Sequence, residues 1–261
     1  MPDYKKNIIL ASLLFFVLFS MAQEGTRIAK ENPADAVRKI MIIPFEPKLY
    51  MSDIDMKINE LTKWTFQQIR ENFRNQLNAQ LKLKLQSSAP VVSFYADSSK
   101  MSKDLLYIYK STNLSYDLLS PSPEIKNPTS QNRITNGQLS VEVGSDKKFM
   151  NAKINDDKLL NYLSTKYKTD YFIFINQLDI KNNMETYDLA TDIYQREITV
   201  HYSIFDKSGK NRSAGIAVYQ FSSKVNLPKQ IVATAFSPIA RYIAEKLDEI
   251  IKPEITGTQK K

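Results

Sequence analysis

The chain has 261 residues, a formal net charge of +8 at pH 7 and no cysteine. Without cysteine, these residues contain no disulfide framework, no thiol nucleophile and no thiolate metal site. We also expect that the chain is not a lipoprotein, because the lipid of that class is attached to a cysteine. The basic residues are scattered, so we interpret the charge as a solvated surface and expect no nucleic-acid partner.

The N-terminal segment has the pattern of an export signal. Lys5 and Lys6 precede an uncharged apolar run from Ile8 to Phe19, and Ser20-Met21-Ala22 has the small-residue spacing that signal peptidase accepts. The run is shorter than the roughly 20 apolar residues that a membrane-spanning helix needs. We therefore predict a cleaved signal peptide over 1–22 and an exported protein that is periplasmic or outer-membrane-associated. No transmembrane segment is expected after signal removal.

Composition divides the remaining chain into a leader, a domain and a tail. A flexible polar leader at 23–37 precedes a predicted single α/β domain at 38–253, and a polar tail follows at 254–261. The stretch at about 96–150 is predicted to be an insertion. Its centre, 111–137, is rich in proline, asparagine, serine and threonine, which is typical of a long loop.

The first half of the domain is predicted as strand, helix, strand and helix. Ile40–Ile43 is a continuous apolar run, typical of a strand buried on both faces, and a long helix follows from Ser52, which resembles a capping box with Asp55. The apolar stripe of this helix is expected to face the core: Phe66, Ile69, Phe73, Leu77 and Leu81. Val91–Tyr95 is a second predicted strand, and Ser102–Tyr109 is a short predicted helix.

The second half begins with a predicted helix through Leu163, capped by Asp156 or Asp157. Tyr171–Ile175 is another continuous apolar strand and should lie at the centre of the sheet. After a polar stretch, Glu197–Phe205 alternates between apolar and polar residues, which indicates a half-buried antiparallel strand.

The C-terminal part is predicted as a hairpin and a closing helix. A turn at Gly209 leads into the hairpin partner, Ala214–Phe221, and the last helix runs to Ile251. Pro238 interrupts this helix, and Pro253 is expected to end it. The predicted fold is α/β, with a mixed sheet, helices packed on its faces, a C-terminal β-hairpin and a closing helix.

The element pattern resembles a group of bacterial envelope domains. The resemblance rests on a buried strand ending in Pro44-Phe45, the long helix, the aspartate-initiated strand Asp170–Ile175 and the turn Asp206-Lys207-Ser208-Gly209; it covers about 40–85 and 156–251. The group includes the curli secretion lipoproteins, the N-terminal domain of the Tol-system propeller protein and the lipoprotein activators of penicillin-binding proteins. The resemblance implies a non-catalytic envelope protein that acts through protein contacts.

Residues for nucleophilic or nucleotide chemistry are few. The single histidine, His201, lies on the polar side of a predicted strand and is interpreted as a surface residue, since no Gly-x-Ser-x-Gly motif accompanies it. The six glycines are dispersed, so no glycine-rich phosphate loop is expected. We predict no catalytic residue and no cofactor.

A group of polar and aromatic residues follows the first strand, at the end of a sheet where α/β proteins often place sites. Glu46, Tyr50, Asp53 and Asp55 form a candidate interaction or cation site. Capping of the following helix is the competing interpretation, and we favour it because the spacing and glycine of a calcium loop are missing. Trp64 is a candidate aromatic anchor for a partner, or it packs under the leader or the insertion.

The sequence favours a non-catalytic envelope protein that binds an envelope protein partner. Two alternatives stay open: a carboxylate-based hydrolase acting on envelope glycans, and a soluble carrier of a small apolar ligand. An enzyme requires convergent carboxylates in a cleft, a carrier requires an apolar cavity, and an interaction module requires an exposed apolar patch. The partner and the oligomeric state are left open.

Overall fold

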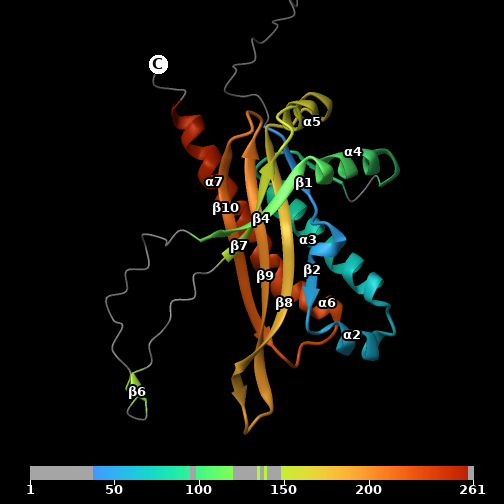
Figure 1. The fold of residues 1–261 in the computed structure, drawn as a ribbon, viewed down its shortest axis with the longest axis vertical. Coiled ribbons are helices and arrows are strands. Elements are labelled where there is room, and N and C mark those ends of the chain that lie inside the picture. The colour runs from blue at the N-terminus through green and yellow to red at the C-terminus, as the bar shows by residue number, and fades with distance from the viewer. Residues whose placement is uncertain (1–37, 95–97, 120–133, 136–137, 140–147, 258–261) are drawn as a thin grey trace, which may run out of the picture. The chain divides into compact units, whose positions relative to one another are not determined.

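The computed structural model describes residues 38–94, 98–119, 134–135, 138–139 and 148–257 (Figure 1). The predicted signal peptide and leader lie outside the described residues, as does part of the predicted insertion. The helices are α2 (Asp55–Thr62), α3 (Phe66–Leu85), α4 (Ser98–Lys110), α5 (Leu159–Tyr167), α6 (Pro228–Ile231) and α7 (Ser237–Gly257), with a 3-10 turn at Pro47–Leu49 and a π-helical turn at Val232–Phe236. The strands are β1 (Ile40–Ile43), β2 (Tyr50–Ser52), β3 (Val91–Ser93), β4 (Thr112–Leu118), β5 (Ile134–Thr135), β6 (Gln138–Leu139), β7 (Lys148–Ile154), β8 (Tyr171–Asp188), β9 (Ile193–Asp206) and β10 (Asn211–Ser222).

The main sheet has the strand order β10-β9-β8-β1-β3, and β2 pairs with β8 beyond the end of β1. β1 is parallel to β3 and β8, and β2 is parallel to β8, whereas β8, β9 and β10 are antiparallel. This arrangement confirms the predicted mixed α/β fold with a C-terminal hairpin and a closing helix.

Both faces of the sheet are covered. Helices α3, α6 and α7 pack with the π-helical turn on one face, and α4, α5 and the β4–β7 pair pack on the other (Figure 1). Within β8, Ile173 belongs to the first core cluster and Phe172 and Phe174 to the second. A strand covered on both sides buries every residue, which is why the predicted central strands are continuous apolar runs.

The predicted long helix from Ser52 is wrong, because two helices occupy this region. Lys63 adopts a left-handed conformation (φ 62°) and ends α2. Thr65 then begins α3 with a capping box, since its hydroxyl accepts from the Gln68 N–H and the Gln68 side chain accepts from the Thr65 N–H. The capping box predicted at Ser52 and Asp55 does not form.

Of the two prolines of the closing helix, Pro238 lies at the expected interruption, and Pro253 does not end the helix. The π-helical turn at Val232–Phe236 lies directly before Pro238, and its wider hydrogen-bond pattern accommodates a residue without an N–H. The expectation that Pro253 ends the helix is wrong, because α7 continues to Gly257. A proline removes one hydrogen bond of the ladder, and the last turn keeps its helical conformation here.

Several strand segments were not predicted, among them β2, β4, β7 and the second half of β8. The start of the expected loop at 111–137 is strand β4, which pairs antiparallel with β7 over seven residue pairs. The polar stretch after Ile175 is also strand, because β8 continues to Asp188. Hairpin strands are held by backbone pairing and need no continuous apolar pattern, so the sequence signal was weak.

Candidate functional site

The five predicted site residues line three separate cavities. Tyr50, Asp53 and Asp55 line one depression, Glu46 lines a crevice beside β8, and Trp64 lines a cavity between α3 and α6. The separation arises because β2 forms after Glu46 and because α2 ends before Trp64. Of the predicted residues, only Tyr50, Asp53 and Asp55, which are close in sequence, lie in one place.

The depression around Tyr50, called here the α2–α3 depression, is open and has a volume of about 430 Å³. It is lined by Tyr50, Ser52, Asp53, Asp55, Met56, Phe66 and Arg70. Met56 and Phe66 are 68% and 57% exposed, so the prediction that Phe66 belongs to the core stripe is wrong. Phe66 is the first residue of α3, and the stripe reaches the sheet only from Ile69 onward. Two large apolar side chains thus face solvent beside polar groups.

Hydrogen bonds within the protein occupy the acidic groups of this depression. The Tyr50 hydroxyl donates to Asp55 Oδ1 at 2.6 Å, and Asp53 Oδ2 accepts from the Asn182 N–H at 3.0 Å. Burial raises the pKa of Asp55; burial and the Asp55 carboxylate raise the pKa of Tyr50. In contrast, Arg70 Nε is buried without a hydrogen-bond partner among the described residues. Among the polar groups of this depression, the one with an unsatisfied hydrogen-bonding atom is therefore the Arg70 guanidinium, which is a cationic donor.

Neither Asp53 nor Asp55 caps α2 through its side chain. The N-cap position is Ile54, where no side-chain cap hydrogen bond forms. Asp55 is in the first turn, where a negative charge interacts favourably with the helix dipole. Within the described residues, no three histidine, aspartate or glutamate side chains gather closely enough to hold a metal ion.

We expect the double variant Asp53→Asn/Asp55→Asn to unfold within about 1 kcal/mol of the wild type, because each asparagine oxygen still accepts the same hydrogen bond. We also expect calcium and magnesium to leave the melting temperature of both proteins unchanged. Differential scanning calorimetry with chloride salts of both cations measures the two effects. A saturable rise in the wild type that the double variant lacks would instead establish a cation site.

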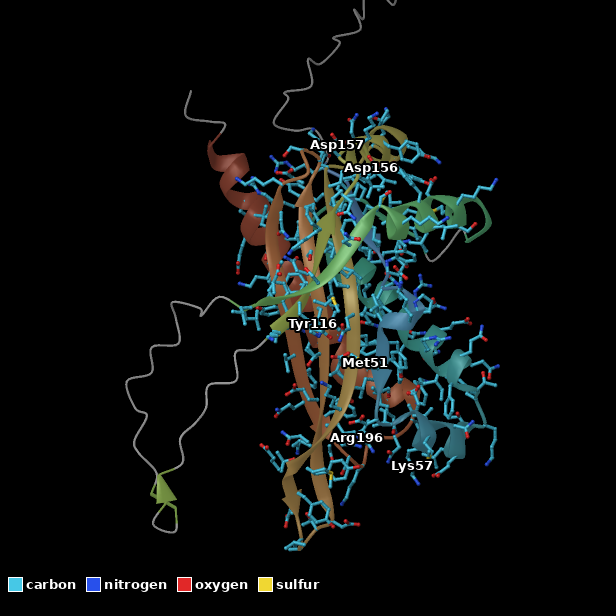
Figure 2. All side chains as sticks on the ribbon, viewed as in Figure 1. Met51, Lys57, Tyr116, Asp156, Asp157 and Arg196 are labelled. Carbon is cyan, nitrogen blue, oxygen red and sulfur yellow. The ribbon has the colours of Figure 1, made fainter. Side chains whose placement is uncertain are left out.

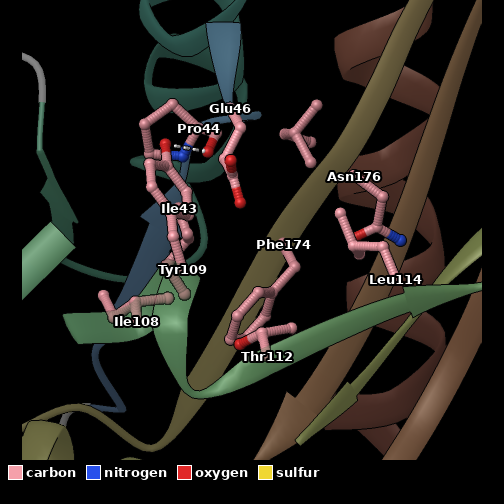
Figure 3. A pocket seen from close by; sticks show the side chains of 10 residues that line it. Ile43, Pro44, Glu46, Ile108, Tyr109, Thr112, Leu114, Phe174 and Asn176 are labelled. Atoms are coloured by element: carbon pink, nitrogen blue, oxygen red, sulfur yellow. Dashed lines mark hydrogen bonds between the residues drawn. The ribbon is translucent and has the colours of Figure 1, made fainter. Parts of the chain in front are cut away.

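Glu46 lines a crevice beside β8 (Figure 3). The crevice lies between the part of β8 that pairs with β1 and the part that pairs with β2. The pairing of β1 with β8 ends at Phe174, and the pairing of β2 begins at Leu178. Asn176 lies between them at a bulge in the β8–β9 ladder. Bulges commonly re-aim a side chain, and here the Asn176 side chain lines the crevice.

Unpartnered acceptor atoms line this crevice. The Asn176 amide nitrogen donates to Met150 O at 2.9 Å and Ser203 Oγ at 2.8 Å, which leaves Asn176 Oδ1 buried without a partner. Thr112 Oγ1 is also buried and unpartnered. The crevice volume is about 20 Å³. This space suits a water-sized hydrogen-bond donor and is too small for a larger ligand.

The cavity that Trp64 lines, called here the Trp64 cavity, has a volume of about 320 Å³. It is lined by Trp64, Asn72, Gln76, Lys229 and Val232. Trp64 is half-buried in the link between α2 and α3 and packs against the first core cluster. Its backbone carbonyl accepts from Asn59 Nδ2 at 2.7 Å, which fixes the link. The tryptophan is therefore held in place with one side open to the cavity.

The interpretation of His201 as a surface residue is wrong. The side chain is buried beneath the β4–β7 pair, and the residue is 4% exposed. His201 Nδ1 accepts from the Met150 N–H at 2.9 Å, and the ring makes an edge contact with Tyr116 of β4. The surrounding polar layer consists of Asn151, Asn176, Gln177, Asp179, His201 and Ser203. The unpredicted hairpin is what buries this layer.

Neither a protein family nor a curated protein matches the chain. Several solved structures of bacterial proteins match its fold. Lipoprotein GNA1162 from Neisseria meningitidis is 10% identical, with a TM-score of 0.35, over 80% of this chain and 99% of that chain. The hypothetical protein CT253 from Chlamydia trachomatis is 11% identical, with a TM-score of 0.36, over 83% and 96%. A putative lipoprotein from Caulobacter crescentus CB15 is 14% identical, with a TM-score of 0.21, over 34% and 70%.

The resemblance to the curli, Tol and penicillin-binding-protein activator families is not confirmed by these matches. The expectation that the chain is not a lipoprotein is contradicted, because two of the matched structures are named as lipoproteins. Among the described helices, none is both long and apolar enough to cross a membrane.

Proposed function

We propose that this protein is a non-catalytic interaction module of the bacterial cell envelope, and that it binds a protein partner through the α2–α3 depression. The observation that carries the proposal is the exposure of Met56 and Phe66 on the rim of an open depression. Large apolar side chains in contact with water are characteristic of a docking surface when they gather in one place.

The chemistry of the depression fits a protein interface. Aromatic residues, methionine and arginine are the residue types enriched at interface cores, and Phe66, Met56 and Arg70 supply one of each. Arg70 is half-buried in the lining of the depression, and a guanidinium is a suitable donor to a partner's carbonyl or carboxylate oxygen. Tyr50 and Asp55 are hydrogen-bonded to each other and supply the polar part of the depression.

The two alternative functions have less support. A glycan hydrolase needs free convergent carboxylates, whereas Asp53 and Asp55 both accept hydrogen bonds from the protein itself. A carrier of an apolar ligand needs a pocket of about 300–1,000 Å³. The crevice beside Glu46 is lined mainly by apolar residues, but its volume is only about 20 Å³. The two larger cavities have charged or amide side chains in their linings, among them Asp53, Asp55 and Lys229, which disfavours an apolar ligand.

Site-specific photocrosslinking in intact cells tests the proposal. We expect benzoylphenylalanine at position 66 to give one discrete protein adduct, because Phe66 is exposed on the proposed surface. The additional change Met56→Asp should remove the adduct, since a charge on the rim opposes burial of the apolar contact. Met56 is exposed, so this change should alter the stability of the protein by only about 0.5 kcal/mol.

A matched control is available on the same helix. Leu83 is also exposed but lies near the C-terminal end of α3, away from the depression. The photocrosslinker at position 83 should give no adduct. Equal labelling from positions 66 and 83, or persistence of the position-66 adduct in Met56→Asp, would count against the α2–α3 depression as the docking surface.

A further inference from the structure

The hairpin of β8 and β9 extends beyond the rest of the sheet (Figure 1). The pairing of β2 with β8 ends at Ile180, and the pairing of β10 with β9 ends at Gln195. In residues 183–194, called here the arm, neither β2 nor β10 pairs with these strands, and the ladder between β8 and β9 is irregular from Asn183 to Asp188. Leu189 lies in the turn of the arm and is 88% exposed, the highest exposure among the large apolar residues of the described chain.

Internal hydrogen bonds hold the turn of the arm in one conformation. Asp188 Oδ1 accepts from the Ala190 N–H at 2.9 Å, and Asp188 Oδ2 accepts from the Thr191 hydroxyl at 2.7 Å. The Tyr187 hydroxyl donates to Asp192 Oδ1 at 2.5 Å. These hydrogen bonds order the loop that carries Leu189, so presenting this side chain to a partner costs little conformational entropy.

The base of the arm is also anchored. Arg196 is buried, and its guanidinium donates to Asn182 Oδ1 at 3.1 Å, Val225 O at 3.0 Å and Asn226 Oδ1 at 2.9 Å (Figure 2). These contacts tie both strands of the hairpin to the segment that follows β10. The direction in which the arm projects is therefore set by the folded domain.

The arm is acidic within a basic protein. Glu185, Asp188 and Asp192 lie in it, and the sequence has no lysine or arginine from 182 to 195. Hydrogen bonds from Thr191 and the backbone lower the pKa of Asp188, so its carboxylate is ionised at neutral pH. The whole chain carries a net charge of +8, so the arm has the opposite sign to the rest of the molecule.

The Trp64 cavity is complementary to this arm in chemistry. Trp64 and Val232 provide apolar surface, and Lys229 provides a cation on an exposed side chain. No acidic side chain lines the cavity. The Trp64 cavity therefore offers apolar contact to Leu189 and a positive charge to the carboxylates on either side of it.

We propose that the protein self-associates head to tail, with Leu189 of one copy inserted into the Trp64 cavity of a second copy and Asp188 and Asp192 facing Lys229. The two surfaces differ, so each copy offers one arm and one cavity. Such contacts build chains, or rings when the rotation closes. The proposal uses different residues from the α2–α3 depression and does not depend on the function proposed there.

Sedimentation equilibrium of the purified protein tests the association. We expect the average mass to increase with protein concentration and to decrease with added salt, because screening weakens the contact between exposed charges. Leu189→Ser, which alters the arm, and Lys229→Glu, which alters the cavity, should each weaken association about tenfold or more. Both residues are exposed, so both variants should fold. Leu83→Ser, an exposed position in α3, should associate as the wild type does.

A mixture of the two variants gives the sharpest result. Leu189→Ser retains an intact cavity and Lys229→Glu retains an intact arm, so the mixture should form 1:1 dimers and nothing larger. A wild-type protein that stays monomeric at every concentration would overturn the proposal. Association that neither variant weakens, or a mixture that remains monomeric, would overturn it equally. Photocrosslinking at position 66 is unaffected by any of these outcomes.

Discussion

Ile173→Asp is expected to prevent the chain from folding. The Ile173 side chain is fully buried in β8, between Ile42 of β1 and Ile204 of β9 in the register of the sheet. A carboxylate at this position has no partner and costs several kcal/mol, against a total stability of about 5–15 kcal/mol for a typical domain. Circular dichroism during heating should show no cooperative transition.

Val218→Asp is the matched control, because Val218 lies in β10 of the same sheet and is 43% exposed. Its carboxylate remains hydrated, so we expect a loss of at most about 1 kcal/mol. A soluble Ile173→Asp protein that melts cooperatively would contradict the position of β8 at the centre of the sheet.

The central strands were predictable because a strand covered on both faces needs apolar side chains at consecutive positions. Ile40–Ile43 and Tyr171–Ile175 are apolar throughout, and the structure covers both of their faces. The stripe of α3 from Ile69 onward was predictable for the same reason, since its spacing matches one helical face. In both cases the local pattern and the tertiary environment agree.

The sequence does contain a signal for the break between α2 and α3, but a second capping-box pattern, earlier in the chain, predicts the start of one long helix. Thr65 and Gln68 have the spacing of a capping box, as do Ser52 and Asp55, and only the former pair forms one. The break itself depends on the left-handed conformation of Lys63, which is uncommon for lysine and has no mark in the sequence. This break exposes Phe66 and places it with Arg70 beside Tyr50.

The candidate site was predictable only where its residues are neighbours in sequence. Tyr50, Asp53 and Asp55 lie within one short segment, and the structure keeps them together. Glu46 was grouped with them because it is also close in sequence, but the pairing of β2 with β8 separates it. Contacts between distant segments therefore decide the membership of the site.

His201 shows most clearly what a single sequence leaves out. The alternation of β9 correctly assigns Ile198, Val200, Tyr202 and Ile204 to the core. The opposite side of the strand was expected to face solvent, but β4 and β7 cover His201 and Ser203. The exposure of these two residues depends on a hairpin about 50 residues away in the chain, which no local pattern reveals.

The hydrogen bond from Met150 determines which ring nitrogen of His201 carries the hydrogen. A backbone N–H is always a donor, so the bond from Met150 requires Nδ1 to be an unprotonated acceptor. The ring hydrogen is then on Nε2, which lies 3.5 Å from Asp179 Oδ2 and makes no hydrogen bond within the described residues. Asp179 accepts from Gln177 Nε2 at 2.8 Å, and the Tyr116 hydroxyl donates to Gln177 Oε1 at 3.1 Å. The histidine thus joins the hairpin to the sheet.

We expect His201→Leu to lower the free energy of unfolding by about 1–3 kcal/mol, because it leaves the buried Met150 N–H without an acceptor. Urea denaturation measures this loss, and amide hydrogen exchange should show faster exchange at Met150 and along β4 and β7 than elsewhere in the sheet. Thr199→Val, two residues earlier on the same side of β9, should change the free energy by less than about 1 kcal/mol, because Thr199 is only half-buried and lies outside the polar layer. Equal stabilities of His201→Leu and the wild type would mean that the β4–β7 pair does not depend on this hydrogen bond for its place on the sheet.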